Sequence, residues 1–149
     1  MTKHHPKLIR EDVATNVFIH LRDNIEWEDG VPSKKGFTRK AKPMQFGDDP
    51  VLDFIIFDAF EKLEINSTKL QFIYLNYYRD GEDWCPVHTH PGTKQMIISL
   101  GTVRQLLVGT KEYPMGNGDV IIFGASGHGI AKDPQCKEAR IAIALFLDK

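Results

Sequence analysis

The sequence has few cysteines and no long hydrophobic run, and both absences limit where the protein can work. Its 149 residues include two cysteines, Cys85 and Cys136, which are too few for a disulfide framework. No segment approaches the roughly 18 to 20 apolar residues of a membrane span, and no apolar signal sequence follows the polar first residues. We therefore expect a soluble, intracellular and cytoplasmic protein without a membrane partner, in which both thiols are reduced.

An excess of charge of one sign is also missing. The formal net charge is −1, which gives the chain no general attraction to nucleic acid. The basic residues are nevertheless concentrated in residues 33–42, SKKGFTRKAK, which contain no acid and include Phe37 and Arg39. A basic loop with an aromatic side chain is a plausible contact for a phosphate and a base, although such runs are more often solvated surface. Internal repeats, a Gly-rich phosphate loop and zinc-finger spacing are absent, which excludes those classes.

Two segments have the apolar spacing of amphipathic helices. In residues 11–23, EDVATNVFIHLRD, apolar residues recur at helical spacing, and two acids stand where the helix dipole favours them. Residues 51–63, VLDFIIFDAFEKL, repeat the pattern after an Asp-Asp-Pro sequence that is typical of a helix start. We expect the three phenylalanines of the second segment to pack in the core: Phe54, Phe57 and Phe60.

From Lys69 onward, short runs of β-branched and aromatic residues alternate with Gly, Pro, Asn and Asp. The expected strands are residues 70–78, 95–100, 103–109, 118–123 and 139–147. Helices followed by packed strands predict one α+β domain over residues 1–149. In this domain a helical segment, about residues 1–66, supports an antiparallel sandwich or barrel formed by residues 67–149.

The last expected strand has two chemically different faces. Because side chains alternate along a strand, one face carries only large aliphatic residues and the other a cation, two small residues and an aromatic ring. The first set is Ile141, Ile143, Leu145 and Leu147, and the second is Arg140, Ala142, Ala144 and Phe146. Small residues leave room for a cavity, so we expect Arg140 to face a pocket.

Three histidines form a candidate metal site. His88 and His90 are separated by one residue, so on a strand both imidazoles project from the same face. His128 follows residues 118–123 within a Gly-rich stretch, where backbone can fold close to a site. Three protein ligands leave coordination positions open for a substrate or oxygen, which is typical of a catalytic rather than a structural metal.

Several motifs, in this order, resemble the AlkB-like branch of the iron(II) and 2-oxoglutarate dependent dioxygenases. The segment GFTRKAKPMQFG (36–47) is similar to that family's substrate-side segment, and NYYRDGEDWCPVH (76–88) to the sequence that leads into its first metal histidine. MIISLG (96–101), NGDVIIFGASGHGI (117–130) and ARIAIALF (139–146) match its later strands. The resemblance implies a double-stranded β-helix, also called a jelly roll, buttressed by the two helices.

The resemblance also implies cofactors and residue roles. His88 and His128 would bind Fe(II), and the reaction would use 2-oxoglutarate and O2 to hydroxylate or demethylate a substrate. Asn76 and Tyr78 would contact 2-oxoglutarate, and Arg140 would pair with its distal carboxylate, a geometry that a planar guanidinium suits. The implied substrate is an alkylated base in single-stranded or damaged nucleic acid, as in DNA or RNA repair. Its expected contacts are Arg39, Phe37 and Trp84.

Three positions depart from the family's pattern. His90 stands where the family has a metal-binding carboxylate, and Ala142 and Phe146 stand where it has a polar residue and a second arginine. Exchanging Asp for neutral His removes a negative charge, while exchanging Arg for Phe removes a positive one. We therefore hypothesise that the changes at His90 and Phe146 compensate each other.

Two other classes of function stay open at the level of sequence. His88, His90, Gln95 and His128 approximate a cupin pattern, in which cupins have an acid near the position of Gln95. Such a three-histidine metalloprotein would be a thiol dioxygenase, an isomerase or a metabolite binder, and three imidazoles suit zinc as well as iron. The other alternative is a domain that has lost catalysis and only binds nucleic acid or a partner.

Overall fold

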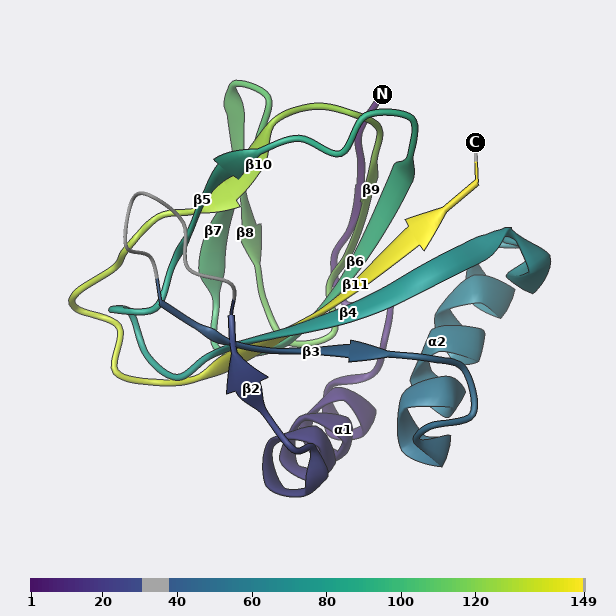
Figure 1. Ribbon diagram of the computed structural model, residues 1–149, viewed down its shortest axis with the longest axis horizontal. Coiled ribbons are helices and arrows are strands. Elements are labelled where there is room, and N and C mark those ends of the chain that lie inside the picture. The colour runs from purple at the N-terminus through teal and green to yellow at the C-terminus, as the bar shows by residue number, and fades with distance from the viewer. Residues whose placement is uncertain (31–37, 149) are drawn as a thin grey trace.

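The computed structural model describes residues 1–30 and 38–148, and it contains a large sheet, a smaller sheet and two helices (Figure 1). The large sheet separates the helices from the smaller sheet, so each of its faces is covered by a different partner. Neither helix in the described ranges is long and apolar enough to cross a membrane.

The two helices lie where the sequence pattern predicts them. Helix α1 spans Glu11–Asn24 and helix α2 spans Pro50–Lys62. The side chain of Asp49 caps α2 by accepting hydrogen bonds from the backbone N–H groups of Val51 and Leu52, and Pro50 occupies the first turn. Both ends of the expected helices are therefore correct to within one residue.

The prediction that all three phenylalanines of α2 pack in the core is wrong for two of them. Phe60 is 2% exposed, but Phe54 is 57% and Phe57 39% exposed. The buried side of α2 is formed by Leu52, Ile55, Ile56, Ala59 and Phe60. At 3.6 residues per turn, Phe54 and Phe57 lie on the opposite side of the helix from this aliphatic face.

All strand pairs in both sheets are antiparallel. The order in the large sheet is β1 (Lys3–His5), β9 (Val120–Phe123), β6 (Lys94–Gly101), β11 (Arg140–Leu147), β4 (Leu70–Tyr78), β3 (Lys40–Met44) and β2 (Glu28–Asp29). The order in the smaller sheet is β5 (Cys85–His88), β10 (His128–Ile130), β7 (Arg104–Val108) and β8 (Lys111–Met115). A 3-10 helix, Ser67–Lys69, precedes β4.

Each of the five expected strands is present, which confirms the predicted α+β class. Six further strands are not predicted from the sequence: β1, β2, β3, β5, β8 and β10. These strands are short, from two to five residues, and carry polar residues or proline, so no clear alternation of apolar residues marks them.

The two faces of β11 separate two cores, as the alternation predicts. Ile141, Ile143, Leu145 and Leu147 belong to a cluster that includes the buried residues of both helices. Ala142 and Ala144 belong to a second cluster, between the two sheets. The second face therefore points toward the smaller sheet, which carries His88 and His128.

Candidate metal centre

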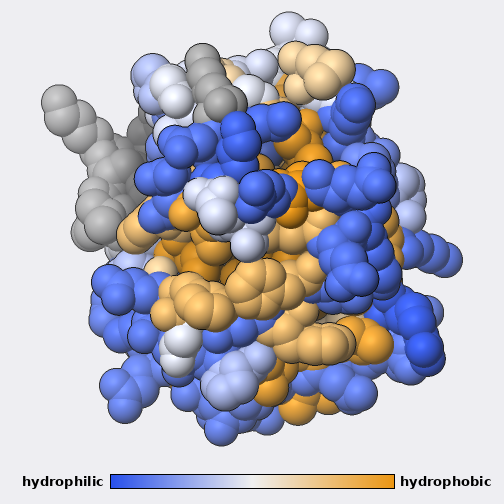
Figure 2. Space-filling model, turned by 90° about the vertical axis from the view of Figure 1, so that its right-hand side faces the viewer, coloured by the Kyte–Doolittle hydropathy of each residue, from blue (hydrophilic) through white to orange (hydrophobic). Residues whose placement is uncertain are grey.

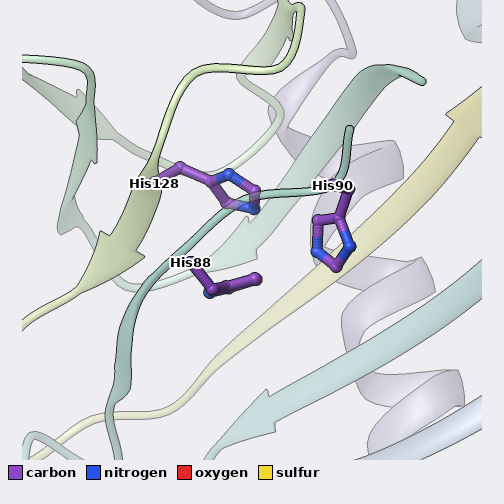
Figure 3. A group of neighbouring side chains, drawn as sticks. All are labelled: His88, His90 and His128. Atoms are coloured by element: carbon purple, nitrogen blue, oxygen red, sulfur yellow. The ribbon is translucent and has the colours of Figure 1, made fainter. Parts of the chain in front are cut away.

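The three histidines converge on one point. His88 ends β5, His128 begins β10, and the antiparallel register places these two residues directly opposite each other. One ring nitrogen from each of His88, His90 and His128 lies within 4.8 Å of the others (Figure 3). The ring centroids of His88 and His128 are 4.3 Å apart. His90 follows the end of β5 rather than lying on it, which differs from the expectation that both histidines share a strand.

Close contact between β5 and β10 brings His128 to His88. Gly129, directly after His128, approaches β5 so closely that a Cβ atom there would lie 2.8 Å from the carbonyl oxygen of Cys85. A glycine at this position therefore permits the strand pairing that creates the centre.

Backbone carbonyls fix the orientation of two imidazoles. His88 Nδ1 lies 2.8 Å from the carbonyl oxygen of Pro86, and His128 Nδ1 lies 3.2 Å from that of Ser126. A carbonyl only accepts hydrogen bonds, so each Nδ1 is assigned the proton and each Nε2 keeps its lone pair. This is the arrangement in which histidines bind metals through Nε2.

The surroundings of His90 and His128 favour the neutral imidazole that a metal requires. Burial, with a smaller contribution from His88, lowers the pKa of His128 to about 4. Burial and then His88 also lower the pKa of His90. Three neutral nitrogen donors fit a divalent transition metal such as iron or zinc. The donor set therefore fits a catalytic metal with open coordination positions.

A cavity of about 440 Å³ connects the histidines with the wall formed by β4 and β11. On β11 the lining residues are Arg140, Ala142, Ala144 and Phe146, which is the predicted face. None of the described residues that line the cavity is an aspartate or glutamate. Phe72, at the start of β4, is 45% exposed and its ring lies 5.7 Å from that of Phe146. The side of the molecule where β4 begins and β11 ends carries a group of hydrophobic residues (Figure 2).

Arg140 is a buried cation without an acidic partner. It is 1% exposed, and its Nε donates a hydrogen bond of 2.8 Å to Ser99 Oγ. Within residues 1–30 and 38–148, its Nη2 has no hydrogen-bond partner and no carboxylate forms an ion pair with it. Burial lowers the pKa of Arg140 to about 10, so the guanidinium still carries its charge at neutral pH.

Tyr78 and Asn76 lie beside Arg140 in the same cavity. The Arg140 guanidinium lies 5.4 Å from the centre of the Tyr78 ring. Burial raises the pKa of Tyr78 to about 12, which keeps the phenol protonated and able to donate a hydrogen bond. Asn76 accepts a 2.7 Å hydrogen bond from Nε of Arg39 through its Oδ1 atom. The amide hydrogens of Asn76 can thus serve a ligand.

The three residues expected to contact the substrate do not lie together in the structure. Arg39 lines the cavity, whereas Trp84 lines a second hollow together with Val87 and Leu107. Phe37 lies outside the described residues. The structure thus brings together the expected metal and cosubstrate residues, but it does not bring Trp84 to the same cavity.

Three residues that line the cavity, Phe72, Tyr74 and Gln95, are not among the site residues predicted from the sequence, and neither is Ser99, which accepts a hydrogen bond from Arg140. Phe72 and Tyr74 share a strand face with Asn76 and Tyr78, so the alternation in residues 70–78 contained the signal that finds them. In the sequence Gln95 belongs only to a cupin-like pattern, and no local signal marks Ser99. Ser99 is found only from the strand register, which pairs it with Ala142 beside Arg140.

The sequence matches no protein-family model and no curated protein, but the fold is similar to that of solved structures. A prolyl-4-hydroxylase from Pseudomonas putida has a TM-score of 0.67 at 12% identity, over 99% of this chain and 92% of that chain. A prolyl hydroxylase from Trichoplax adhaerens, solved with a hypoxia inducible factor peptide, has a TM-score of 0.72 at 10% identity, over 99% and 83%. A predicted oxalate decarboxylase from Thermotoga maritima has a TM-score of 0.59 at 14% identity, over 85% and 95%.

These similarities confirm the jelly-roll architecture that the sequence resemblance implies. At such low identity they concern the fold alone. None of the three proteins is described as acting on nucleic acid, so they give no support to the AlkB-like assignment in particular.

Proposed function

We propose that the chain is an Fe(II)- and 2-oxoglutarate-dependent dioxygenase that hydroxylates a carbon–hydrogen bond of its substrate. One observation carries this proposal: the buried guanidinium of Arg140, whose Nη2 has no hydrogen-bond partner within the described residues, and the three histidines line the same cavity. A buried cation without an anionic partner is costly, because its desolvation is not offset by an ion pair. The cavity is therefore suited to a ligand that brings a carboxylate to Arg140.

The chain's own residues have distinct roles in this proposal. His88, His90 and His128 hold the metal, and Arg140 binds the distal carboxylate of 2-oxoglutarate while Tyr78 donates a hydrogen bond to it. Ala142 and Ala144 leave room for the carbon chain between these two ends. Phe146 and Phe72 exclude water from the open side of the cavity. Fe(II), when bound, supplies the activation of O2.

The test is the production of succinate. Purified protein, reconstituted anaerobically with Fe(II) and ascorbate, is given 2-oxoglutarate and O2, and succinate is quantified. We expect metal-dependent succinate that disappears in an Arg140→Gln variant and is partly retained in Arg140→Lys. Absence of succinate from a protein that retains one equivalent of iron would contradict the proposal.

The substrate is a separate part of the proposal. The sequence resemblance favours an alkylated base as the substrate, in line with the basic residues 33–42. Release of formaldehyde from N-methylated oligonucleotides tests this substrate. The two prolyl hydroxylases suggest peptide substrates instead, for which hydroxylation adds one oxygen atom to the mass of the peptide. An increase of succinate above the substrate-free rate identifies which class couples to turnover.

A second candidate function rests on the ligand set. Three histidines without a carboxylate, in a fold shared with a predicted oxalate decarboxylase, favour a cupin-type metalloprotein such as a thiol dioxygenase. This candidate needs no 2-oxoglutarate. Oxygen uptake with a small carboxylate-bearing thiol, without succinate, would favour it. A catalytically inactive binding domain would retain little metal after gentle purification.

A further inference from the structure

Gln95 is a second polar side chain of the cavity that lacks a partner. The residue is 1% exposed and lines the same cavity as the histidines. Its Nε2 atom has no hydrogen-bond partner in residues 1–30 and 38–148. A buried donor without a partner destabilises a folded protein. An apolar side chain of similar size, such as leucine or methionine, would avoid this cost, so the presence of glutamine here suggests a role in binding.

The strand register places Gln95 beneath the metal centre. Gln95 pairs with Phe146 of β11 on one side and with Phe123 of β9 on the other. Residues directly opposite in antiparallel strands share a face of the sheet, so the three side chains stand together. The Phe123 ring lies 4.8 Å from the His128 ring, and the Phe146 ring lies 5.0 Å from the His90 ring. The amide of Gln95 is thus flanked by the two rings that support two of the metal-binding imidazoles.

The chemistry of the amide suits an anionic ligand. Its immediate strand neighbours are two phenylalanines, which offer no hydrogen-bond acceptor. The terminal torsion of a glutamine is soft, so a small rotation turns the amide hydrogens toward the cavity. A hydrogen bond from a neutral donor to a charged acceptor is stronger than one between neutral groups.

We propose that Gln95 is a ligand-binding residue, whose amide donates a hydrogen bond to an anionic ligand held at His88, His90 and His128. The inference rests on the proposed function for the identity of this ligand, which is 2-oxoglutarate. Gln95 then holds the end of the cosubstrate at the histidines, while Arg140 holds the other end. The interaction links the affinity for 2-oxoglutarate to a side chain that does not bind the metal.

The test compares binding of Mn(II) and of 2-oxoglutarate by calorimetry without oxygen. We expect Gln95→Leu to leave the affinity for Mn(II) unchanged and to weaken 2-oxoglutarate binding about 10- to 100-fold. Gln95→Glu removes the donor and adds a negative charge, so it should bind 2-oxoglutarate at least as weakly as Gln95→Leu. The control is Ile121→Val, which trims a buried side chain of the same cluster that does not line the cavity. This control should bind 2-oxoglutarate like the wild type.

Other results would overturn the inference. If Gln95→Leu loses affinity for Mn(II) and 2-oxoglutarate together, Gln95 acts on the metal. If Gln95→Glu binds 2-oxoglutarate as the wild type does, no donor is needed. Should the wild type not bind 2-oxoglutarate at all, the proposed function fails, and sodium azide binding to the Co(II)-loaded protein becomes the readout. Weaker azide binding by Gln95→Leu than by Ile121→Val then supports the role of Gln95, and equal binding refutes it.

Discussion

On one face of β11, four aliphatic side chains pack against the helices, while on the other face Arg140, two alanines and Phe146 line a cavity. The first face is chemically uniform and fully packed. The second face contains a buried cation and small residues, which do not optimise stability. Since one strand carries both faces, the comparison separates what holds the domain together from what binds a ligand. Substitutions on the two faces should therefore change different measurements.

The largest effect is expected at the metal. His128→Ala removes the proposed Nε2 ligand, whose ring is oriented by the carbonyl of Ser126. Loss of a group that only supports a ligand costs about 10- to 100-fold in metal affinity, so loss of the ligand itself should exceed that. We expect no succinate production and a Mn(II) affinity reduced more than about 100-fold. Calorimetry measures the affinity, and an unchanged circular dichroism spectrum is the control for folding.

The next largest effect is expected from a substitution on the packed face of β11, and it should reduce stability. Ile143→Ala removes a fully buried side chain from the cluster between the sheet and the helices. The free energy of unfolding should fall by about 2 to 5 kcal/mol. Urea unfolding measures this loss of stability. The affinity for Mn(II), measured by calorimetry on the folded variant, should not change. A variant that keeps its stability but loses metal would contradict the separation of the two faces.

Arg140→Gln should have the opposite effect to Ile143→Ala: it should weaken ligand binding without reducing stability. The variant replaces a buried cation, which has no carboxylate partner among the described residues, by a neutral side chain, so the free energy of unfolding should not decrease. Affinity for 2-oxoglutarate should fall about 100-fold, because a bidentate charged interaction is lost. Calorimetry on the Mn(II)-loaded protein measures this fall, and Arg140→Lys, which keeps the charge but not the fork, should lie between the two. Loss of stability with unchanged 2-oxoglutarate binding would assign Arg140 a structural role.

The smallest effect is expected for substitutions of His90 and Phe146, whose ring centroids lie 5.0 Å apart. His90→Asp adds a negative charge next to the anionic ligand, and we expect 2-oxoglutarate binding to weaken about tenfold, or by about 1.4 kcal/mol. Adding Phe146→Arg to this variant should restore the affinity, because the two charges compensate. Binding by His90→Asp that is equal to or tighter than that of the wild type would refute the compensation.

The sequence predicted those parts of the fold that depend on local periodicity. Alternation in residues 139–147 assigned Arg140 to a cavity wall, and the spacing of apolar residues located both helices. The same kind of reasoning failed for Phe54 and Phe57, because helical spacing does not tell which of two apolar sides faces the core. Local signals thus define elements better than they define burial.

The candidate site required information that is not local. His88 and His128 meet because β5 and β10 pair in one register, and Gly129 allows their close approach. No spacing in the sequence encodes that register. The proposed role of Gln95 likewise depends on its pairing with Phe123 and Phe146 on neighbouring strands. The spacing of the histidines and the motif resemblance pointed to the candidate ligands, while only the packed structure identified the neighbours that orient them.

The most direct test asks whether the histidines and Arg140 act on one ligand. 2-Oxoglutarate is titrated without oxygen into wild-type protein, once metal-free and once loaded with Mn(II), and heats of binding are recorded. We expect one equivalent to bind to the metal-loaded protein and much weaker binding without metal, since the ligand then loses one of its two contacts. Equal affinity with and without Mn(II), or no binding in either case, would contradict a shared site.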